Sequence, residues 1–389
     1  MPKIDLNDRI PERRRVLMLT VTKDCNLRCK YCYELKANKT KDVMSLDLAK
    51  KIISNYMEMD DGFDKIEIQF FGGEPMLAFP RIREIVDWFH SREWQKEHLF
   101  DICTNGTILN EEMKRWLRDN RNRVWVGFSL DGSRTSHNLT RSNSYDKLKD
   151  NMPFFLENWP GQFAKMTICA ENIPYVAESI IELEELEIPF TSGLVFEDIW
   201  GVPIQKRRLL SIYAKQLSQL VEYYSKNPDL FPATIVGREI EYMSDSSTIS
   251  QSHKEMPRFC GAGHEMIEVD VDGSISPCHR FAKWVTQRNP PALSSANQQK
   301  EWKPDKCANC KLISICPSCA GYNWEVNGDS GIRTTYHCEA FKLEVLASAK
   351  LQARRLKSKD ISISDNISAE EYRMRNKIDS ILYLVDKGI

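Results

Sequence analysis

Short apolar and β-branched runs alternate with amphipathic stretches from Val16 to about Tyr224. The runs predict six strands, at Val16–Val21, Lys65–Phe71, Leu99–Cys103, Val124–Ser129, Lys165–Ala170 and Phe190–Phe196. Apolar residues three or four apart predict helices at about Ser45–Met59, Arg81–His90, Glu111–Asn120, Tyr145–Glu157, Tyr175–Glu187 and Lys206–Tyr224. Strands and helices that alternate in this way predict an α/β fold with parallel strands and right-handed crossovers.

The pattern changes after Asn227, so residues 1–227 are predicted to form the first domain. Residues 228–259 are mixed, polar and rich in serine, and predict a linker. Residues 260–340 hold seven cysteines with little periodicity, which is typical of a small fold stabilised by metal rather than by an apolar core. Residues 341–389 predict a helical extension of two helices separated by the polar segment Ser358–Asn366.

Composition narrows the class of protein. The 389 residues are 42% hydrophobic and 28% charged with a net charge of −1, which gives no reason to expect nucleic acid or an anionic membrane as a partner. The N-terminus is polar, and no apolar run approaches the roughly 18 residues of a membrane span. We therefore expect a cytoplasmic protein, where twelve cysteines favour metal sites over disulfides.

Three cysteines follow the first predicted strand: Cys25, Cys29 and Cys32, spaced C-x3-C-x2-C. Three thiolates on one loop can hold three irons of a 4Fe-4S cluster and leave the fourth iron without a protein ligand. A structural metal site would instead close its coordination with a fourth ligand. Since the loop follows a strand, the cluster should lie at a strand's C-terminal end, where parallel α/β folds place their chemistry.

Further motifs follow the next predicted strands in order: Gly72-Gly73-Glu74-Pro75, then Thr104-Asn105-Gly106, then Ser129-Leu130-Asp131-Gly132, then His137-x3-Arg141. Together with the cysteine spacing and the aromatic residue Tyr31, this series resembles the radical S-adenosylmethionine (radical SAM) superfamily. The run Gly72–Pro75 alone, or the run Ser129–Gly132 alone, would predict only a turn. The resemblance implies that the six strand–helix units form a partial, TIM-like (β/α)6 barrel.

The resemblance also implies roles for the motif residues. Gly72 and Gly73 would let the backbone approach the methionine end of SAM, Pro75 would stiffen the turn, and Glu74 would accept hydrogen bonds from the ammonium. Arg141 would bind the SAM carboxylate, and Ser129 and Asp131 the ribose. Further expected contacts of SAM are Thr104 and Asn105, with Tyr31 and Tyr33 near the adenine. His137 is expected to be structural, and Cys103 and Cys169, inside strand patterns, to be buried apolar thiols.

The C-terminal cysteines are Cys260, Cys278, Cys307, Cys310, Cys316, Cys319 and Cys338. Their two C-x2-C pairs alone leave zinc and iron–sulfur clusters equally open, although only five residues separate the pairs. The series resembles the SPASM extension of radical SAM enzymes that act on peptides. The resemblance assigns four of the cysteines to an outer 4Fe-4S cluster (Cys307, Cys310, Cys316, Cys338) and three to an inner one (Cys260, Cys278, Cys319).

The inner set lacks a fourth cysteine. We hypothesise an open iron there that binds a substrate thiolate; the alternative is a histidine ligand, namely His253, His264 or His279. Auxiliary clusters would provide a path for the electron that a substrate radical must lose. With the first cluster, the sequence predicts three 4Fe-4S clusters and SAM as cofactors.

These expectations favour a radical SAM/SPASM enzyme that forms a thioether or carbon–carbon cross-link in a ribosomally made precursor peptide, with a flavodoxin or ferredoxin as electron donor. One alternative is an anaerobic sulfatase maturase, which makes formylglycine, although such enzymes carry an aspartate base where this chain has His279. Another is a non-enzymatic iron–sulfur or zinc protein. Only 24 residues precede Cys25, so leader recognition should use a separate protein, the barrel surface or the C-terminal helices.

Overall fold

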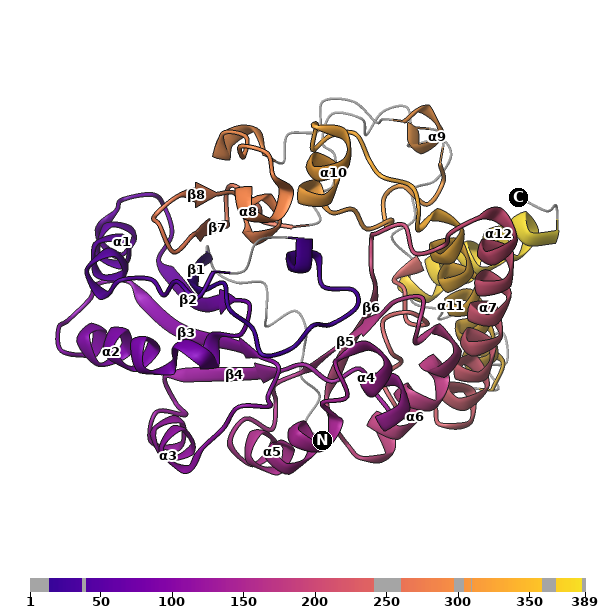
Figure 1. The fold of residues 1–389 in the computed structure, drawn as a ribbon. Helices are drawn as coiled ribbons and strands as arrows, with labels where there is room; N and C mark the ends of the chain where they lie inside the picture. Colours follow the sequence, from indigo (N-terminus) through magenta and orange to yellow (C-terminus); the bar gives the residue numbers. More distant parts are fainter. Residues whose placement is uncertain are drawn as a thin grey trace.

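The computed structural model describes residues 14–36, 40–240, 260–296, 304–308, 310–358 and 369–386. Its larger sheet has the strand order β4-β3-β2-β1-β7-β8, and a second sheet pairs β5 with β6. The first six strands are β1 (Arg14–Thr22), β2 (Lys65–Gly72), β3 (Glu97–Thr104), β4 (Val124–Phe128), β5 (Ala164–Ile168) and β6 (Phe190–Leu194). They pair in parallel, and a single parallel bridge between Ser129 and Lys165 connects β4 with β5 (Figure 1).

Helices cover the outer face of these strands. They are α1 (Leu46–Glu58), α2 (Phe79–His90), α3 (Glu111–Asp119), α4 (Arg134–Thr140), α5 (Tyr145–Asn158), α6 (Val176–Glu185) and α7 (Pro203–Lys226). Alternate strand residues, such as Ile66, Ile68 and Phe70 of β2, are fully buried between strands and helices. The strand residues between them face the concave side, as the two-residue period of a strand requires. This architecture confirms the predicted α/β, TIM-like partial barrel.

The C-terminal region extends the barrel sheet. Strand β7 (Met266–Val269) pairs in parallel with β1, and β8 (Ile275–Ser276) pairs antiparallel with β7. The following helical segments are α8 (Lys283–Thr286), α9 (Asp305–Ala308) and α10 (Ala320–Asn327). Figure 1 shows this region lying over one end of the barrel.

Two helices end the described chain, α11 (Cys338–Ser358) and α12 (Ala369–Asp386). Helix α11 packs along α7 (Figure 1). Tyr213 of α7 donates a hydrogen bond of 2.7 Å to the Glu344 carboxylate of α11. Arg238 donates to the same carboxylate, with its Nε 2.9 Å from Glu344 Oε2. The first part of the predicted linker is therefore packed against α11 as far as Ile240, which is fully buried. Residues 241–259 lie outside the described part.

The predicted strands and the longer helices of the barrel match the structure to within a few residues. Helix α4 and strands β7 and β8 were missed. In the described part of the chain, no helix combines the length and apolar character needed to cross a lipid bilayer.

Candidate active site at the C-terminal edge of the barrel

The loop with Cys25, Cys29 and Cys32 leaves the C-terminal end of β1, and all three cysteines are partly exposed. Its backbone is tied to neighbouring elements. Lys30 N–H donates to the Thr140 carbonyl at 2.9 Å, and Arg28 N–H donates to Ser142 Oγ at 2.9 Å. The loop is therefore held against the C-terminal end of α4.

Gly72, the last residue of β2, and Gly73 allow a close approach of the backbone that leads into this loop. A Cβ on Gly72, whose φ is +130°, would lie 1.9 Å from the Thr22 carbonyl oxygen. A Cβ on Gly73 would lie 2.3 Å from that of Asp24, directly before Cys25. Gly73 N–H donates to the Thr22 carbonyl at 3.0 Å. Only glycine permits the strand ends to approach so closely.

The Glu74 carboxylate connects the C-terminal ends of β2 and β3. It is buried, and it accepts from Thr104 Oγ1 at 2.6 Å, from Asn105 N–H at 2.7 Å and from Met76 N–H at 3.0 Å. Burial raises the pKa of Glu74, while these three donors act against that rise. The carboxylate is therefore hydrogen-bonded by protein donors, and its predicted contact with the ammonium of SAM stays a prediction. Pro75 begins the short helix after Glu74 and is buried.

Asn105 connects the same place to the cysteine loop. Its side-chain Nδ2 donates to Asn26 Oδ1 at 2.8 Å, and Asn26 Nδ2 donates to Thr107 Oγ1 at 2.8 Å. The Thr104-Asn105 motif thus positions the loop as well as β3.

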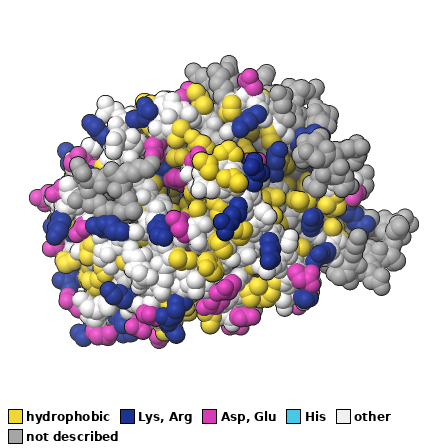
Figure 2. Space-filling view, turned by 45° about the vertical axis from the view of Figure 1, so that its right-hand side comes forward, with side chains coloured by type: hydrophobic (Ala, Val, Ile, Leu, Met, Phe, Trp, Pro, Cys, Tyr) yellow, Lys and Arg dark blue, Asp and Glu magenta, His cyan; other side chains and the backbone are white. Residues whose placement is uncertain are grey.

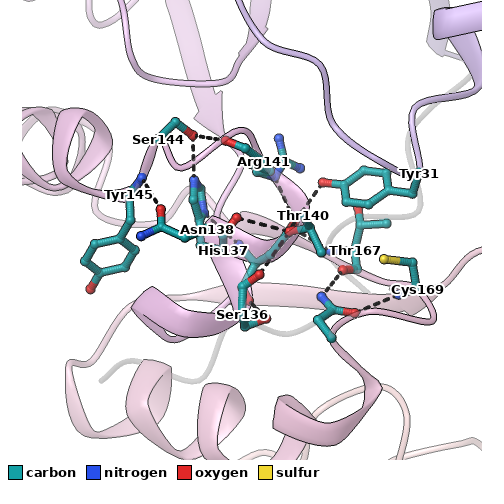
Figure 3. A network of polar contacts seen from close by, with 12 residues as sticks. Tyr31, Ser136, His137, Asn138, Thr140, Arg141, Ser144, Tyr145, Thr167 and Cys169 are labelled. Carbon is teal, nitrogen blue, oxygen red and sulfur yellow. Dashed lines mark hydrogen bonds and ion pairs between the residues drawn. The ribbon is translucent and has the colours of Figure 1, made fainter. Parts of the chain in front are cut away.

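Asp131 is the centre of a buried polar network at the end of β4. Its Oδ2 accepts from Thr140 Oγ1 at 2.7 Å, from Tyr31 Oη at 2.8 Å and from Arg141 Nε at 2.9 Å (Figure 3). Its Oδ1 accepts from Thr167 N–H at 3.0 Å, and the side chain is fully buried. Asp131, which is predicted to bind the ribose of SAM, therefore accepts hydrogen bonds from protein donors. Ser129, the second residue predicted to bind the ribose, has no such side-chain bond among the described residues.

Only part of the Arg141 guanidinium is hydrogen-bonded to the described residues. Only Nε bonds Asp131, and no described residue hydrogen-bonds the two terminal nitrogens. Burial alone would lower the pKa of Arg141, but Asp131 and the nearby Tyr31 and Cys29 raise it above its usual value. A fixed cation beside Cys29 suits the carboxylate of a bound ligand.

Tyr33 lies at the join between the cysteine loop and the C-terminal region. Its ring stacks on His279 with centroids 5.7 Å apart, and the Arg280 guanidinium lies 4.2 Å from its centroid. Arg280 also pairs with Glu197 at 2.5 Å and with Glu325 at 3.0 Å. These contacts of Tyr33 do not involve the Asp131 network. A contact of Tyr33 with the adenine of SAM stays a prediction.

Several of the C-terminal cysteines lie close enough to influence one another electrostatically, and they do so in two groups. The charges of Cys260 and Cys319 both act on Cys278. Those of Cys338, Cys310 and Cys307 act on Cys316, whose pKa burial raises to about 12. Within the described residues, no three His, Cys, Asp or Glu side chains converge as ligands of one metal ion do. Clusters bound by one thiolate per iron need no such convergence.

The histidine candidates for the inner set lie in different settings. His264 is largely exposed and rests against Phe63. His279 packs on Phe71 with centroids 4.5 Å apart, and its Nδ1 lies 3.4 Å from Met18 Sδ. Burial lowers the pKa of His279 to about 3. His253 lies outside the described residues.

Cys103 differs from the sequence prediction. It lies on the concave side of β3 and is only partly buried, and the Lys165 ammonium interacts with its thiol. Cys169 is buried, as expected, but its Sγ lies 3.1 Å from Glu171 Oε2.

Comparison with known proteins decides the family. Residues 19–170 match the model of the radical SAM superfamily. Residues 19–170 form a radical SAM domain. This radical SAM protein is therefore an enzyme, and membership implies SAM and a 4Fe-4S cluster as cofactors.

Relatives match over most of the length. A cysteine-type anaerobic sulfatase-maturating enzyme of Clostridium novyi is 25% identical, over 84% of this chain and 93% of that protein. The radical SAM cyclopropyl synthase TigE of Paramaledivibacter caminithermalis is 24% identical, over 85% of this chain and 73% of TigE. The solved structure of native anSMEcpe with bound AdoMet aligns with a TM-score of 0.65 and 17% identity, over 88% of this chain and 99% of that one. That last likeness concerns the fold.

The residues fit the cofactors that the superfamily implies. Three partly exposed cysteines share one loop, which suits a cluster with one open iron. Beside them, the free end of Arg141 can pair with the carboxylate of SAM.

Proposed function

We propose that this radical SAM enzyme modifies a peptide, forming a thioether or carbon–carbon cross-link in a ribosomally made precursor. When bound, the cluster and SAM supply a 5′-deoxyadenosyl radical, which removes hydrogen from an unactivated C–H bond. The chain itself orients the reactants: Cys25, Cys29 and Cys32 would hold the cluster, and Arg141 the SAM carboxylate. Gly73, Glu74 and Asn105 keep the loop in place.

The observation that carries this proposal is the grouping of the C-terminal thiols into two sets beside the barrel. We propose an outer cluster on Cys307, Cys310, Cys316 and Cys338 and an inner one on Cys260, Cys278 and Cys319. A cross-link removes two hydrogens from the substrate. The radical takes one as a hydrogen atom, and the other leaves as a proton to solvent and an electron that an adjacent cluster can accept. A flavodoxin or ferredoxin in the cytoplasm would supply the reducing electron.

The substrate class draws support from both relatives. A sulfatase-maturating enzyme acts on a polypeptide, and a cyclopropyl synthase forms a carbon–carbon bond. Formylglycine formation remains a second candidate, favoured by the length over which the sulfatase-maturating relative aligns. Against it, the position after Cys278 is His279, which lies packed between Phe71 and Tyr33 and is no carboxylate base.

The test is anaerobic incubation of iron-loaded enzyme with SAM, a reductant and candidate peptides. Mass spectrometry should detect 5′-deoxyadenosine and a peptide lighter by two hydrogens. The Cys29→Ala variant should yield neither product. Formylglycine on a sulfatase peptide, without any cross-link in precursor peptides, would reverse the order of the two candidates.

A further inference from the structure

The concave side of the barrel carries a charged cluster that the motifs do not use. On β5, positions 164, 166 and 168 pack in the core, whereas Lys165 is exposed on the opposite face. On β3, Asp101 and Cys103 alternate with two buried core residues in the same way. The electrostatic neighbours of Lys165 are Cys103 first, then Asp101 and Glu67. Side chains from β2, β3 and β5 can meet in this way only inside the barrel.

Strand β4 lies between β3 and β5, and it forms the base of this charged cluster. Gly127 of β4 pairs with Cys103, and a Cβ on Gly127 would lie 2.9 Å from Gln162 Nε2. The Gln162 amide therefore occupies the space that a side chain would fill. Trp125, two positions earlier, is 38% exposed on the same face. The C-terminal region lies on the other side of the cluster, because the charge of Lys165 also contributes to the lowered pKa of His279.

The carboxylates near Lys165 already have partners. Asp101 Oδ2 accepts from Gln69 Nε2 at 2.7 Å, and Glu67 pairs with Arg14 at 2.6 Å. Among the described residues, Lys165 forms no ion pair with a carboxylate. Its ammonium is thus enclosed by protein yet open to solvent, with cysteine as its first neighbour.

A substrate that fills the barrel must strip water from this ammonium. Removing a cation from water without supplying a counter-charge is costly, whereas a carboxylate on the substrate compensates the loss. A neutral substrate would leave the ammonium buried and poorly paired. The barrel interior therefore favours an acidic ligand.

We propose that Lys165 binds a carboxylate of the peptide substrate inside the barrel, so that the residue to be modified lies close to an acidic group. The inference rests on the proposed function and names its substrate class more closely. The carboxylate can come from an aspartate or glutamate side chain or from the C-terminus of the peptide, and both present the same chemistry to the ammonium.

The test uses iron-loaded enzyme with SAM and three N-acetylated hexapeptides of alanine and glycine. The first is amidated and contains one glutamate, the second has a free C-terminal carboxylate, and the third is amidated and contains glutamine. Calorimetry should show that one of the anionic peptides binds about tenfold more tightly than the glutamine peptide. The anionic peptide that binds identifies the source of the carboxylate.

Variants assign this preference to Lys165. Lys165→Met should abolish it and Lys165→Arg should retain most of it, while Lys149→Met, which removes an exposed lysine on α5, should leave it unchanged. Equal affinity for the three peptides, no binding at all, or a preference that survives in Lys165→Met would each overturn the inference.

SAM cleavage by the same wild-type preparation is measured in parallel. An enzyme that fails to cleave SAM contradicts the proposed function, whatever the peptides do. Cleavage without a charge preference contradicts the role of Lys165 alone.

Discussion

Arg141 Nε lies 2.9 Å from Asp131 Oδ2, and both side chains are buried. The same oxygen accepts from Tyr31, which belongs to the cysteine loop. One carboxylate therefore sets the position of the arginine and of the loop together. A guanidinium fixed through Nε presents its terminal nitrogens in a constant direction, which suits bidentate recognition of a carboxylate. We therefore expect Asp131 to act by positioning Arg141, and a direct contact of Asp131 with the ribose of SAM stays a prediction.

Replacing Asp131 with asparagine should weaken SAM binding by about tenfold or more, because the amide cannot compensate three donors and Arg141 loses its anchor. Unfolding free energy should fall by about 3–5 kcal/mol, the usual cost of breaking a buried ion pair from one side. Equilibrium dialysis with SAM and urea unfolding measure the two effects. Asp146→Asn, which removes an exposed partner of Arg134, is the control and should change stability by less than about 1 kcal/mol. Unaltered SAM affinity in Asp131→Asn would contradict the positioning role.

Gly73→Ala should impair assembly of the first cluster. The new Cβ would lie 2.3 Å from the Asp24 carbonyl oxygen, so the backbone before Cys25 has to move. Iron and sulfide content should drop by about four per chain, the content of one cubane, while the C-terminal clusters remain. Gly161→Ala is the matched control, since a Cβ there meets nothing within 4 Å. If both variants load iron equally, the close approach does not govern the loop.

The sequence predicted the barrel well because alternating apolar positions, such as Ile66, Ile68 and Phe70, report burial directly. It missed α4, a seven-residue helix with little apolar pattern, and β7, a short strand whose pairing with β1 is distant in the chain. The motif residues were found, but their partners were not. Residue type makes Glu74 or Asp131 an acceptor, and only the fold decides that Thr104 or Arg141 supplies the donor. Cys103 was misjudged because Lys165 approaches it from another strand.

Metal content should separate the cluster assignments. Iron-loaded enzyme should contain about twelve irons per chain if three cubanes form. A double variant, Cys310→Ala with Cys316→Ala, should lose about four of them without loss of SAM cleavage, since these thiols belong to the outer set. Iron analysis and the assay for 5′-deoxyadenosine measure the two outcomes separately. Stoichiometric zinc in place of iron would support the zinc alternative.

Protonation of His137 should destabilise the enzyme in mild acid. The ring is fully buried, its Nδ1 accepts from Asp131 N–H at 3.3 Å, and its Nε2 lies 3.0 Å from Ser144 Oγ. Burial and the nearby Arg141 lower its pKa from 6.5 to about 4. Between these pH values the unfolded chain binds a proton that the folded chain excludes, so this contribution to stability falls as the pH drops from about 6.5 to about 4.

The His137→Gln variant isolates that contribution, because glutamine does not titrate. It should be less stable than the wild type at pH 7.5, where it loses the fit of the ring to Asp131 and Ser144. The difference should shrink as the pH falls towards 5, since only the wild type then loses stability at this position. Urea unfolding of both iron-loaded proteins at pH 7.5, 6 and 5 measures it, and the other histidines cancel in the comparison. A difference in stability that stays constant across this range would contradict the prediction that His137 is neutral in the folded enzyme.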